Sequence, residues 1–379
     1  MVSIMILLKN VHLYDKEADS CDMLLAGKEI VQIDPSIECS LRAVDTVIDG
    51  NGMVAIPGYI DQHVHITGGG GEGGFSNQVP SLRLSQLVEA GVTTVIGLLG
   101  TDGSTRSVEN LLAKTKALNE EGWTAYCLTG AYEYPSPTIT GSVRRDVIFI
   151  KEVLGVKIAI SDHRGSGITE EDLVRLAYES RAGGVLSGKP GVVHLHVGSG
   201  KNGLSWVLDI VQKTDLPVSI FKPTHLGRNV EQAVEFANLG GYIDFTAGRN
   251  PDNTAKIVAD VLKRVNPALV TVSSDGNGSM PVWNEKKEMI GISAGRISAD
   301  HDVVKALVKT HGYSLREAIS VLTENPARSL GLYPYKGALQ EDSCADIILL
   351  NDQLEIDTVI ANGRIFLEHG EPKYKPKFE

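Results

Sequence analysis

Short apolar runs alternate with longer amphipathic stretches through the middle of this chain of 379 residues. From about residue 57 to about residue 332, runs of strand length are followed by stretches with helical periodicity, which is the pattern of repeated βα units. The clearest predicted helices cover residues 107–121, 170–181, 230–238 and 254–265. The predicted strands cover residues 58–63, 92–99, 123–128, 154–160, 191–197, 217–222, 241–246 and 269–273.

Eight βα units in succession predict an α/β fold, a (β/α)₈ barrel. Such barrels typically span about 250 residues, which matches the length of the alternating region. A doubly wound open sheet is the alternative for a region of this size. It is disfavoured because no GxGxxG motif follows the first predicted strand.

The two ends of the chain share a different pattern, in which short strands are separated by turns. Each set is too small to build a core alone, so we expect both to pack together as one discontinuous, β-sandwich-like domain. The predicted domains are therefore residues 1–56 plus 333–379 for this small unit and 57–332 for the barrel. The predicted terminal strands cover residues 4–10, 21–26, 29–33, 46–49, 345–350, 357–361 and 364–366.

The amino-acid composition indicates which classes of partner and which cellular compartment to expect. Hydrophobic residues at 42% and charged residues at 22% are typical of a globular protein, and a net charge of -11 disfavours nucleic acid and anionic membranes as partners. The four cysteines at 21, 39, 127 and 344 form no CxxC pair, so we expect reduced thiols and a cytoplasmic protein. The apolar run at residues 2–8 is too short for a signal peptide or a membrane span and predicts a strand.

The first predicted barrel strand ends in a histidine pair, His63 and His65. Residues two apart in a strand lie on the same face, so both imidazoles can bind one metal ion. The carboxyl ends of barrel strands face the active site, which makes this a suitable position for catalysis. Alone, such a pair is equally well explained by two polar residues at a strand end.

Further metal-binding residue types occur at the ends of later strands. His194 and His196 lie in the fifth predicted strand, His225 follows the sixth and Asp275 follows the eighth. Their spacing averages about 30 residues per strand interval, as expected for successive units of one barrel. Side chains at this spacing converge on one rim, so we predict a metal centre there.

Lys157 lies within the apolar run 153–160, which predicts a buried strand. A buried ammonium is costly, and one interpretation is that the side chain extends to pair with Asp162. The alternative is that burial lowers its pKa, so that the neutral amine reacts with CO₂. The resulting carbamate presents two oxygens, enough to bridge two metal ions.

These residues together resemble the amidohydrolase superfamily of binuclear metal hydrolases, and within it the isoaspartyl (β-aspartyl) dipeptidases. The superfamily resemblance rests on the run 58–65 with its HxH motif, the mid-barrel lysine, two later histidines and Ser274-Asp275-Gly276. The similarity covers nearly the whole chain. The narrower resemblance rests on the segments 68–72, 97–102, 129–132, 138–143, 158–164, 223–225 with 228–229, and 273–279.

The resemblance implies two Zn²⁺ ions per subunit, bridged by hydroxide and by Lys157 modified to N6-carboxylysine. His63 and His65 would bind one ion, His196 and His225 the other, and Asp275 would bind metal and shuttle the proton. The bridging hydroxide would attack the β-carbonyl of a β-aspartyl dipeptide, releasing aspartate and an amino acid. Spacing alone does not choose between His194 and His196, and we select His196 because it lies nearer the strand's carboxyl end.

The resemblance also implies the substrate contacts. Glu72, within the glycine-rich loop 68–74, would bind the free α-amino group, and Tyr132 would donate a hydrogen bond to the developing oxyanion. Arg164 and Arg228 would bind the carboxylate of the leaving residue. The aspartyl part would contact Gly70, Gly71, Thr101 and Ser279.

Two alternatives remain open. The chain could be another amidohydrolase acting on cyclic amides or N-acyl amino acids, such as a dihydroorotase or hydantoinase. It could also be a catalytically silent scaffold of the same fold, which is disfavoured because every expected ligand type is present. The resemblance further implies a homo-oligomer, with an octamer as one form, acting on a small dipeptide.

Overall fold

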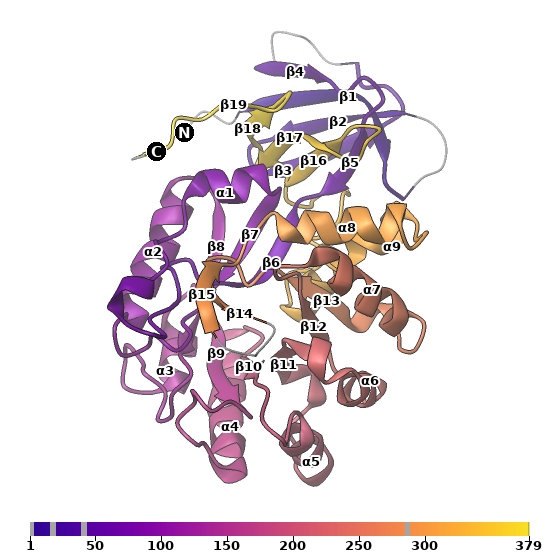
Figure 1. Cartoon of the computed structure of the whole chain (residues 1–379). Helices are drawn as coiled ribbons and strands as arrows, with labels where there is room; N and C mark the ends of the chain where they lie inside the picture. The colour runs from indigo at the N-terminus through magenta and orange to yellow at the C-terminus, as the bar shows by residue number, and fades with distance from the viewer. Residues whose placement is uncertain (1–3, 16–19, 39–43, 285–288, 378) are drawn as a thin grey trace.

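Eight parallel strands form the centre of the molecule (Figure 1). The computed structural model describes residues 4–15, 20–38, 44–284, 289–377 and 379. Six strands pair in chain order from β6 to β11, and β12 pairs with β13. The barrel strands are β6 (Tyr59–Val64), β7 (Val92–Gly97), β8 (Thr124–Gly130), β9 (Val153–Ile160), β10 (Val192–Val197), β11 (Phe221–Thr224), β12 (Ile243–Thr246) and β13 (Val270–Ser273).

Contacts between the two sheets bring the eight strands into a ring. Thr224 on β11 donates a hydrogen bond of 2.6 Å to Asp244 on β12. On the other side, Val64 on β6 forms a parallel bridge with Gly276, just beyond β13. The predicted (β/α)₈ barrel is therefore confirmed, and the strands run on nearly the predicted residues.

The sixth strand differs from its prediction over residues 217–222. A short 3₁₀ helix, η2 (Val218–Ile220), follows Pro217, and β11 begins only at Phe221. Proline fixes its own φ and lacks the N–H that a sheet requires, so the chain turns here before it pairs with β10. Strand β11 therefore ends at Thr224, and His225 follows it directly at the rim of the barrel.

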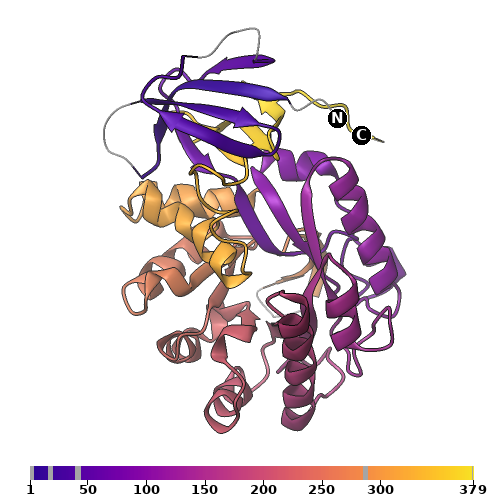
Figure 2. The same cartoon turned by 180° about the vertical axis from the view of Figure 1, so that it is seen from behind.

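Helices surround the barrel on the outside (Figures 1 and 2). Side-chain caps begin several of these helices: Ser107 accepts a hydrogen bond from Asn110, and Thr169 forms a capping box with Asp172. The helices are α1 (Leu84–Glu89), α2 (Val108–Glu120), α3 (Val143–Phe149), α4 (Glu170–Ser187), α5 (Ser205–Lys213), α6 (Val230–Asn238), α7 (Pro251–Leu262), α8 (Ala299–Lys309), α9 (Leu315–Ser320) and α10 (Glu324–Ser329). The remaining 3₁₀ turns are η1 (Phe75–Asn77), η3 (Leu226–Arg228) and η4 (Pro267–Leu269).

Two helices extend beyond their predicted ends. Helix α4 continues six residues past Arg181 through Gly183 and Gly184, which are poor helix formers. A Cβ at Gly183 would lie 2.8 Å from Val147 on α3, so the glycine allows the two helices to approach closely. Helix α7 begins at Pro251 because Asn250 caps it and proline is favoured in the first turn.

The two ends of the chain form one nine-stranded sheet beside the barrel (Figure 2). Its strand order is β19-β18-β17-β16-β5-β1-β2-β3, with β4 paired to β1, and Ile348 of β16 lies opposite Ile56 of β5. Leu8, Met23, Ile347 and Leu349 share one apolar core. The strands are β1 (Met5–Leu13), β2 (Cys21–Ala26), β3 (Glu29–Asp34), β4 (Thr46–Asp49), β5 (Val54–Pro57), β16 (Ile347–Leu350), β17 (Ile356–Ala361), β18 (Arg364–Glu368) and β19 (Glu371–Pro372).

The sheet therefore joins residues from both termini, as the pattern of short strands predicted. The domain boundaries at residues 57 and 332 stay a prediction. A hairpin that the sequence did not predict, β14 (Ser279–Trp283) and β15 (Met289–Ala294), leaves the barrel between β13 and α8. None of the helices in the described parts of the chain has the length and apolar character needed to cross a membrane.

Lys336 joins the sheet to the barrel through a buried ion pair. Its Nζ lies 2.5 Å from Asp346 Oδ2 and donates a hydrogen bond of 2.9 Å to Thr124 on β8. Burial alone would lower the pKa of Lys336, but the adjacent Asp346 carboxylate raises it above its usual value. The ammonium is therefore charged, and it compensates the buried carboxylate.

Replacing Lys336 by methionine is expected to lower the free energy of unfolding by about 3–5 kcal/mol, because Asp346 is left buried without a counter-charge. Urea unfolding followed by circular dichroism measures the loss. Lys305→Met is the matched control, since it removes a more exposed lysine that pairs with Glu355 at 2.6 Å and should cost about 1 kcal/mol or less. Equal losses in both variants would contradict a structural role for the buried pair.

Candidate active site

The predicted site residues meet at the carboxyl ends of the barrel strands. His65 follows β6, His196 lies near the end of β10, His225 follows β11, and Asp275 follows β13. All four line a cavity of about 770 Å³. His225 and Asp275 adopt left-handed backbone conformations with φ of 66° and 53°, which few non-glycine residues do. The chain turns sharply at both positions, directly at the cavity.

Asp275 lies between the two histidines of the HxH motif. Its Oδ1 is 3.3 Å from His63 Nε2 and 3.2 Å from His65 Nε2. Burial alone would raise the pKa of Asp275, but the hydrogen bonds from these histidines hold it well below its usual value. One ligand atom each from His63, His225 and Asp275 lie within 4.8 Å of one another. This spacing is compatible with binding of one divalent cation by the three side chains.

Burial favours the neutral, metal-binding form of the imidazoles. It lowers the pKa of His63 to about 3 and that of His196 to about 4, and it holds the pKa of His225 well below its usual value. His65 Nδ1 is buried and forms no hydrogen bond within the described residues. Neutral imidazole nitrogens with a carboxylate are ligands that suit zinc.

Lys157 lies in the wall of the barrel, fully buried. Its Nζ is 3.4 Å from His63 Nε2, and no carboxylate of the described residues forms an ion pair with it. Burial lowers the pKa of Lys157 to about 7, against the opposing effect of Asp275. The interpretation in which Lys157 pairs with Asp162 is not supported, because Asp162 binds Arg164 and His196 instead.

The two histidines of β10 have different contacts. His194 Nε2 is 3.0 Å from His63 Nδ1 and lies behind that imidazole. His196 lines the cavity, with its Nε2 2.8 Å from Asp162 Oδ2 and its Nδ1 against the Tyr132 hydroxyl. The choice of His196 as the ligand stays a prediction.

Glu72 and Arg164 form an ion pair across the cavity. Arg164 Nη1 is 2.6 Å from Glu72 Oε1, and Ser279 donates a hydrogen bond of 2.6 Å to Glu72 Oε2. Arg164 also binds Asp162 through its Nε and Nη2 atoms, at 3.0 and 2.7 Å. The loop after β6, the loop after β9 and the hairpin after β13 are thus linked around a single carboxylate.

Tyr132 follows β8, and its ring packs against Arg164 of this ion pair. The Arg164 guanidinium carbon lies 5.5 Å from the centre of its ring. Burial raises the pKa of Tyr132 well above its usual value, so its hydroxyl keeps its proton. The side chain is a hydrogen-bond donor at the cavity.

The glycine loop is shaped by close backbone contacts. Gly70 has a φ of 102°, and a Cβ there would lie 2.4 Å from the carbonyl oxygen of Asn77. No other residue fits this position without moving the loop. Glycine at position 70 therefore allows the loop to pack closely against Asn77 beside the cavity.

Eleven of the fourteen predicted site residues line the cavity, while His63 and Lys157 contact the cluster from within the barrel. Gly71 does not line it, although its neighbours do. Asp162 was not predicted as a site residue, although it follows a barrel strand and was considered as a partner of Lys157. Nor did the sequence predict the wall made by the end of β12, the loop after it and the first half of α7: Phe245, Thr246, Gly248, Arg249, Asn253, Thr254 and Ile257.

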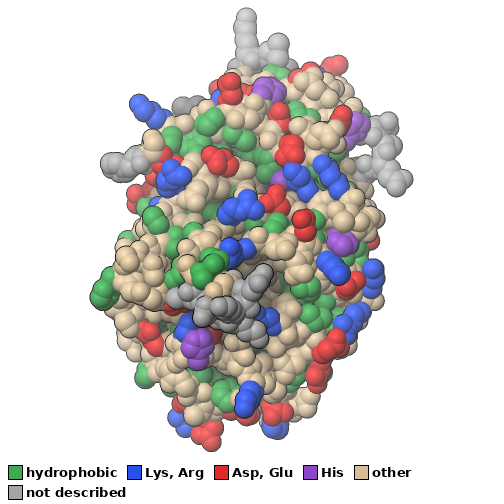
Figure 3. Space-filling model, viewed as in Figure 1, with side chains coloured by type: hydrophobic (Ala, Val, Ile, Leu, Met, Phe, Trp, Pro, Cys, Tyr) green, Lys and Arg blue, Asp and Glu red, His purple; other side chains and the backbone are tan. Residues whose placement is uncertain are grey.

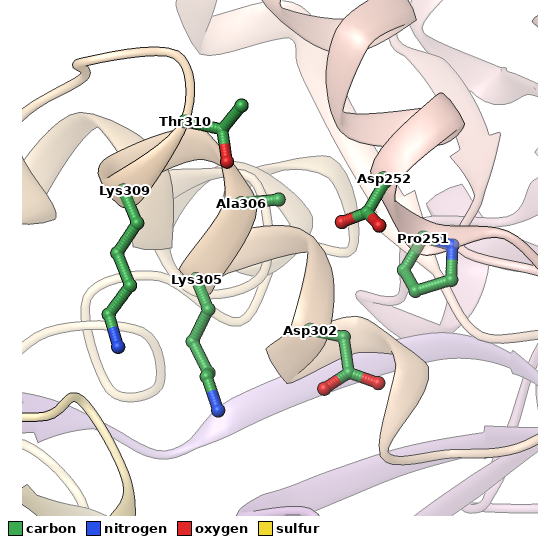
Figure 4. Close-up of a pocket in the computed structure, with 7 residues that line it drawn as sticks. All are labelled: Pro251, Asp252, Asp302, Lys305, Ala306, Lys309 and Thr310. Atoms are coloured by element: carbon green, nitrogen blue, oxygen red, sulfur yellow. The ribbon is translucent and has the colours of Figure 1, made fainter.

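A second hollow of about 370 Å³ lies between α7 and α8 on the outside of the barrel (Figure 4). Its lysines are engaged elsewhere: Lys305 pairs with Glu355 at 2.6 Å, and Lys309 donates to the Gln353 carbonyl. No predicted site residue lines it. The cavity at the carboxyl ends of the strands is therefore the candidate active site.

Comparison with known proteins identifies the family. A model described as "Amidohydrolase family" matches residues 54–366, which is most of the chain. The chain belongs to the amidohydrolase family. Its likeness to β-aspartyl dipeptidases is also confirmed, since a β-aspartyl dipeptidase of Fervidobacterium islandicum AW-1, solved in complex with the β-Asp-Leu dipeptide, is 39% identical with a TM-score of 0.93. That match covers 100% of this chain and 99% of the other.

One further structure and two sequence relatives also match this amidohydrolase. A second structure of the F. islandicum enzyme is 38% identical with a TM-score of 0.90, covering 99% and 100% of the two chains. An L-hydantoinase of Paenarthrobacter aurescens is 22% identical over 98% of this chain and 90% of its own length. A dihydroorotase of Streptococcus pyogenes is 35% identical over a segment that covers 28% of this chain and 25% of that enzyme.

Proposed function

We propose that this hydrolase is a dipeptidase that cleaves the isopeptide bond of β-aspartyl dipeptides to aspartate and an amino acid. The observation that carries the proposal is the 39% identity, over essentially both whole chains, to a protein solved with β-Asp-Leu. The similarity to dihydroorotases covers 28% of the chain. The whole-length match to a hydantoinase has 22% identity.

Two zinc ions fit the residues at the cavity. His63, His65, His196, His225 and Asp275 offer nitrogen and oxygen donors, and Lys157, buried with its Nζ 3.4 Å from His63 Nε2, would hold the ions as a carbamate. The buried His65 Nδ1, which forms no hydrogen bond within the described residues, supports a ligand at this position. When bound, the ions would supply Lewis acidity that activates water and polarises the scissile carbonyl.

Asp275 has the position of a proton shuttle. Its carboxylate lies on the cavity surface and is ionised, which is the form that can accept a proton from the attacking water. It then returns that proton to the leaving nitrogen, which must be protonated for the bond to break. Tyr132, which keeps its proton, donates a hydrogen bond to the oxygen of the carbonyl under attack.

The polar groups around the cavity match the charges of the substrate. Glu72 binds the free α-amine, and its present partners, Arg164 and Ser279, are then available to substrate carboxylates. Arg228 joins Arg164 at the carboxylate of the leaving residue. Gly70 and Thr101 line the cavity and present backbone and hydroxyl groups to the aspartyl part, whereas Gly71 does not line it and donates its N–H to the Asn77 carbonyl.

Hydrolysis of β-Asp-Leu, α-Asp-Leu and dihydroorotate by the purified protein, with metal content measured on the same sample, tests this proposal. We expect turnover of β-Asp-Leu alone and about two zinc ions per chain. Turnover of dihydroorotate without turnover of β-Asp-Leu would move the assignment to the cyclic amidohydrolases. Glu72→Gln sharpens the comparison, because a free α-amine matters for the dipeptide and is absent from the cyclic amide.

A further inference from the structure

One wall of the cavity has no assigned partner in the proposed reaction. It consists of the loop between β12 and α7 and the start of α7, and it contains Arg249, Asn253 and Ile257. Arg249 is exposed, and no ion pair or hydrogen bond of its side chain occurs within the described residues. A free guanidinium at a substrate cavity is a candidate binding group for an anion.

Arg249 and Arg228 line the same cavity, and the proposed function already uses Arg228. His225 Nδ1 is 2.6 Å from Thr246 Oγ1, and this contact joins the ends of β11 and β12. Arg228 lies three residues after His225, and Arg249 lies three residues after Thr246. Both arginines therefore lie on neighbouring segments of the cavity wall.

The acids that line the cavity do not neutralise this pair of arginines. Glu72 binds Arg164 and Ser279, Asp162 binds Arg164 and His196, and Asp275 binds the HxH histidines. The carboxylate nearest in sequence, Asp252, lines the outer hollow instead (Figure 4). Two cations without counter-ions at one edge can accept two anionic groups.

A β-aspartyl dipeptide with a neutral leaving residue offers only one carboxylate at that end, and Arg228 is assigned to it. We propose that Arg249 binds a second carboxylate, the acidic side chain of the leaving residue, so that the enzyme favours β-Asp-Glu and β-Asp-Asp over neutral dipeptides of the same size. This inference rests on the proposed function and names its preferred substrate class. Asn253 adds an uncharged hydrogen-bonding group to the same subsite, and Ile257 packs against the methylene carbons.

The test compares kcat/KM for β-Asp-Glu and β-Asp-Gln, which differ only in the charge of the side chain. With the zinc-loaded wild type we expect a preference of about tenfold for β-Asp-Glu, the effect of one charge-assisted hydrogen bond at an open site. In Arg249→Gln this preference should fall to about one. Lys256→Gln is the matched control, because Lys256 lies on α7 but does not line the cavity; it should keep the preference.

The possible outcomes separate the two proposals. Equal kcat/KM for both dipeptides in the wild type, or an unchanged preference in Arg249→Gln, would overturn the role of Arg249 while leaving the dipeptidase intact. An equal decrease in kcat/KM for both dipeptides in Arg249→Gln would also overturn the proposed role of Arg249, since Arg249 would then bind the carboxylate common to all substrates. No hydrolysis of either dipeptide would remove the dipeptidase assignment together with this inference.

Discussion

Asp275→Asn should lower kcat for β-Asp-Leu by about 10³-fold or more, because asparagine cannot accept a proton from water or return it to the leaving amine. The two side chains have nearly the same shape, so the contacts of Oδ1 with His63 and His65 can persist. Initial rates at saturating substrate measure the effect. Metal analysis of the same sample shows whether the loss arises from proton transfer or from loss of the ions.

Asp252→Asn is the control for this experiment. Asp252 is exposed at the outer hollow, twenty-three residues earlier in the chain, and lies outside the candidate active site. Its variant should retain the wild-type rate. An Asp275→Asn protein with a rate within about tenfold of wild type would exclude the carboxylate as the proton shuttle.

Lys157→Met should reduce bound zinc from about two ions per chain to one or fewer and should abolish turnover, because methionine cannot form the carbamate that bridges both ions. Methionine fills a similar volume, and it removes a buried amine, so the variant is expected to fold. Elemental analysis after gel filtration measures the ions. Retention of two ions per chain would remove the carbamate from the mechanism.

Lys222→Met provides a closely matched control. Lys222 and Lys157 lie opposite His194 on the two strands that flank β10, both are buried, and burial lowers the pKa of each to about 7. They differ in surroundings, since Lys222 Nζ lies 4.2 Å from the ring centre of Tyr242, while Lys157 faces His63. Lys222→Met should therefore keep the full metal content.

The barrel and most of the candidate site could be predicted from the sequence because both depend on local patterns. Buried parallel strands appear in the sequence as continuous apolar runs that end at the rim of the barrel. A polar residue at the end of such a run is therefore easy to recognise. His63, His225 and Asp275 were found in this way, and the structure brings them together. Lys157 was detected because an ionisable residue interrupts an apolar strand.

Features that depend on pairing between distant segments were not predictable. Asp162 was considered only as a partner of Lys157, yet it binds Arg164 and His196, because nothing in its local sequence shows which side chain it faces. Arg249 lies in a polar loop that resembles any surface turn, and only the structure shows that it lines the cavity. The β14–β15 hairpin likewise has no apolar alternation strong enough to indicate two strands.

Charged side chains of both signs are interspersed over the face of the molecule shown in Figure 3. On this face the acidic and basic side chains do not separate into one large patch of either sign. Selection among substrates then depends on groups inside the cavity, such as Arg249, and less on steering from outside.

The pairing of β5 with β16 affects the order in which the molecule is completed during synthesis. Strands β1 to β5 leave the ribosome first, but Ile347, Leu349 and Ile360 of their shared core follow only after the entire barrel has been translated. Until then, Leu8 and Met23 have no cover from that side, and such apolar strands are prone to aggregate. A nascent chain that has emerged as far as residue 340 thus contains every barrel strand but an incomplete sheet, which β16 to β19 then complete.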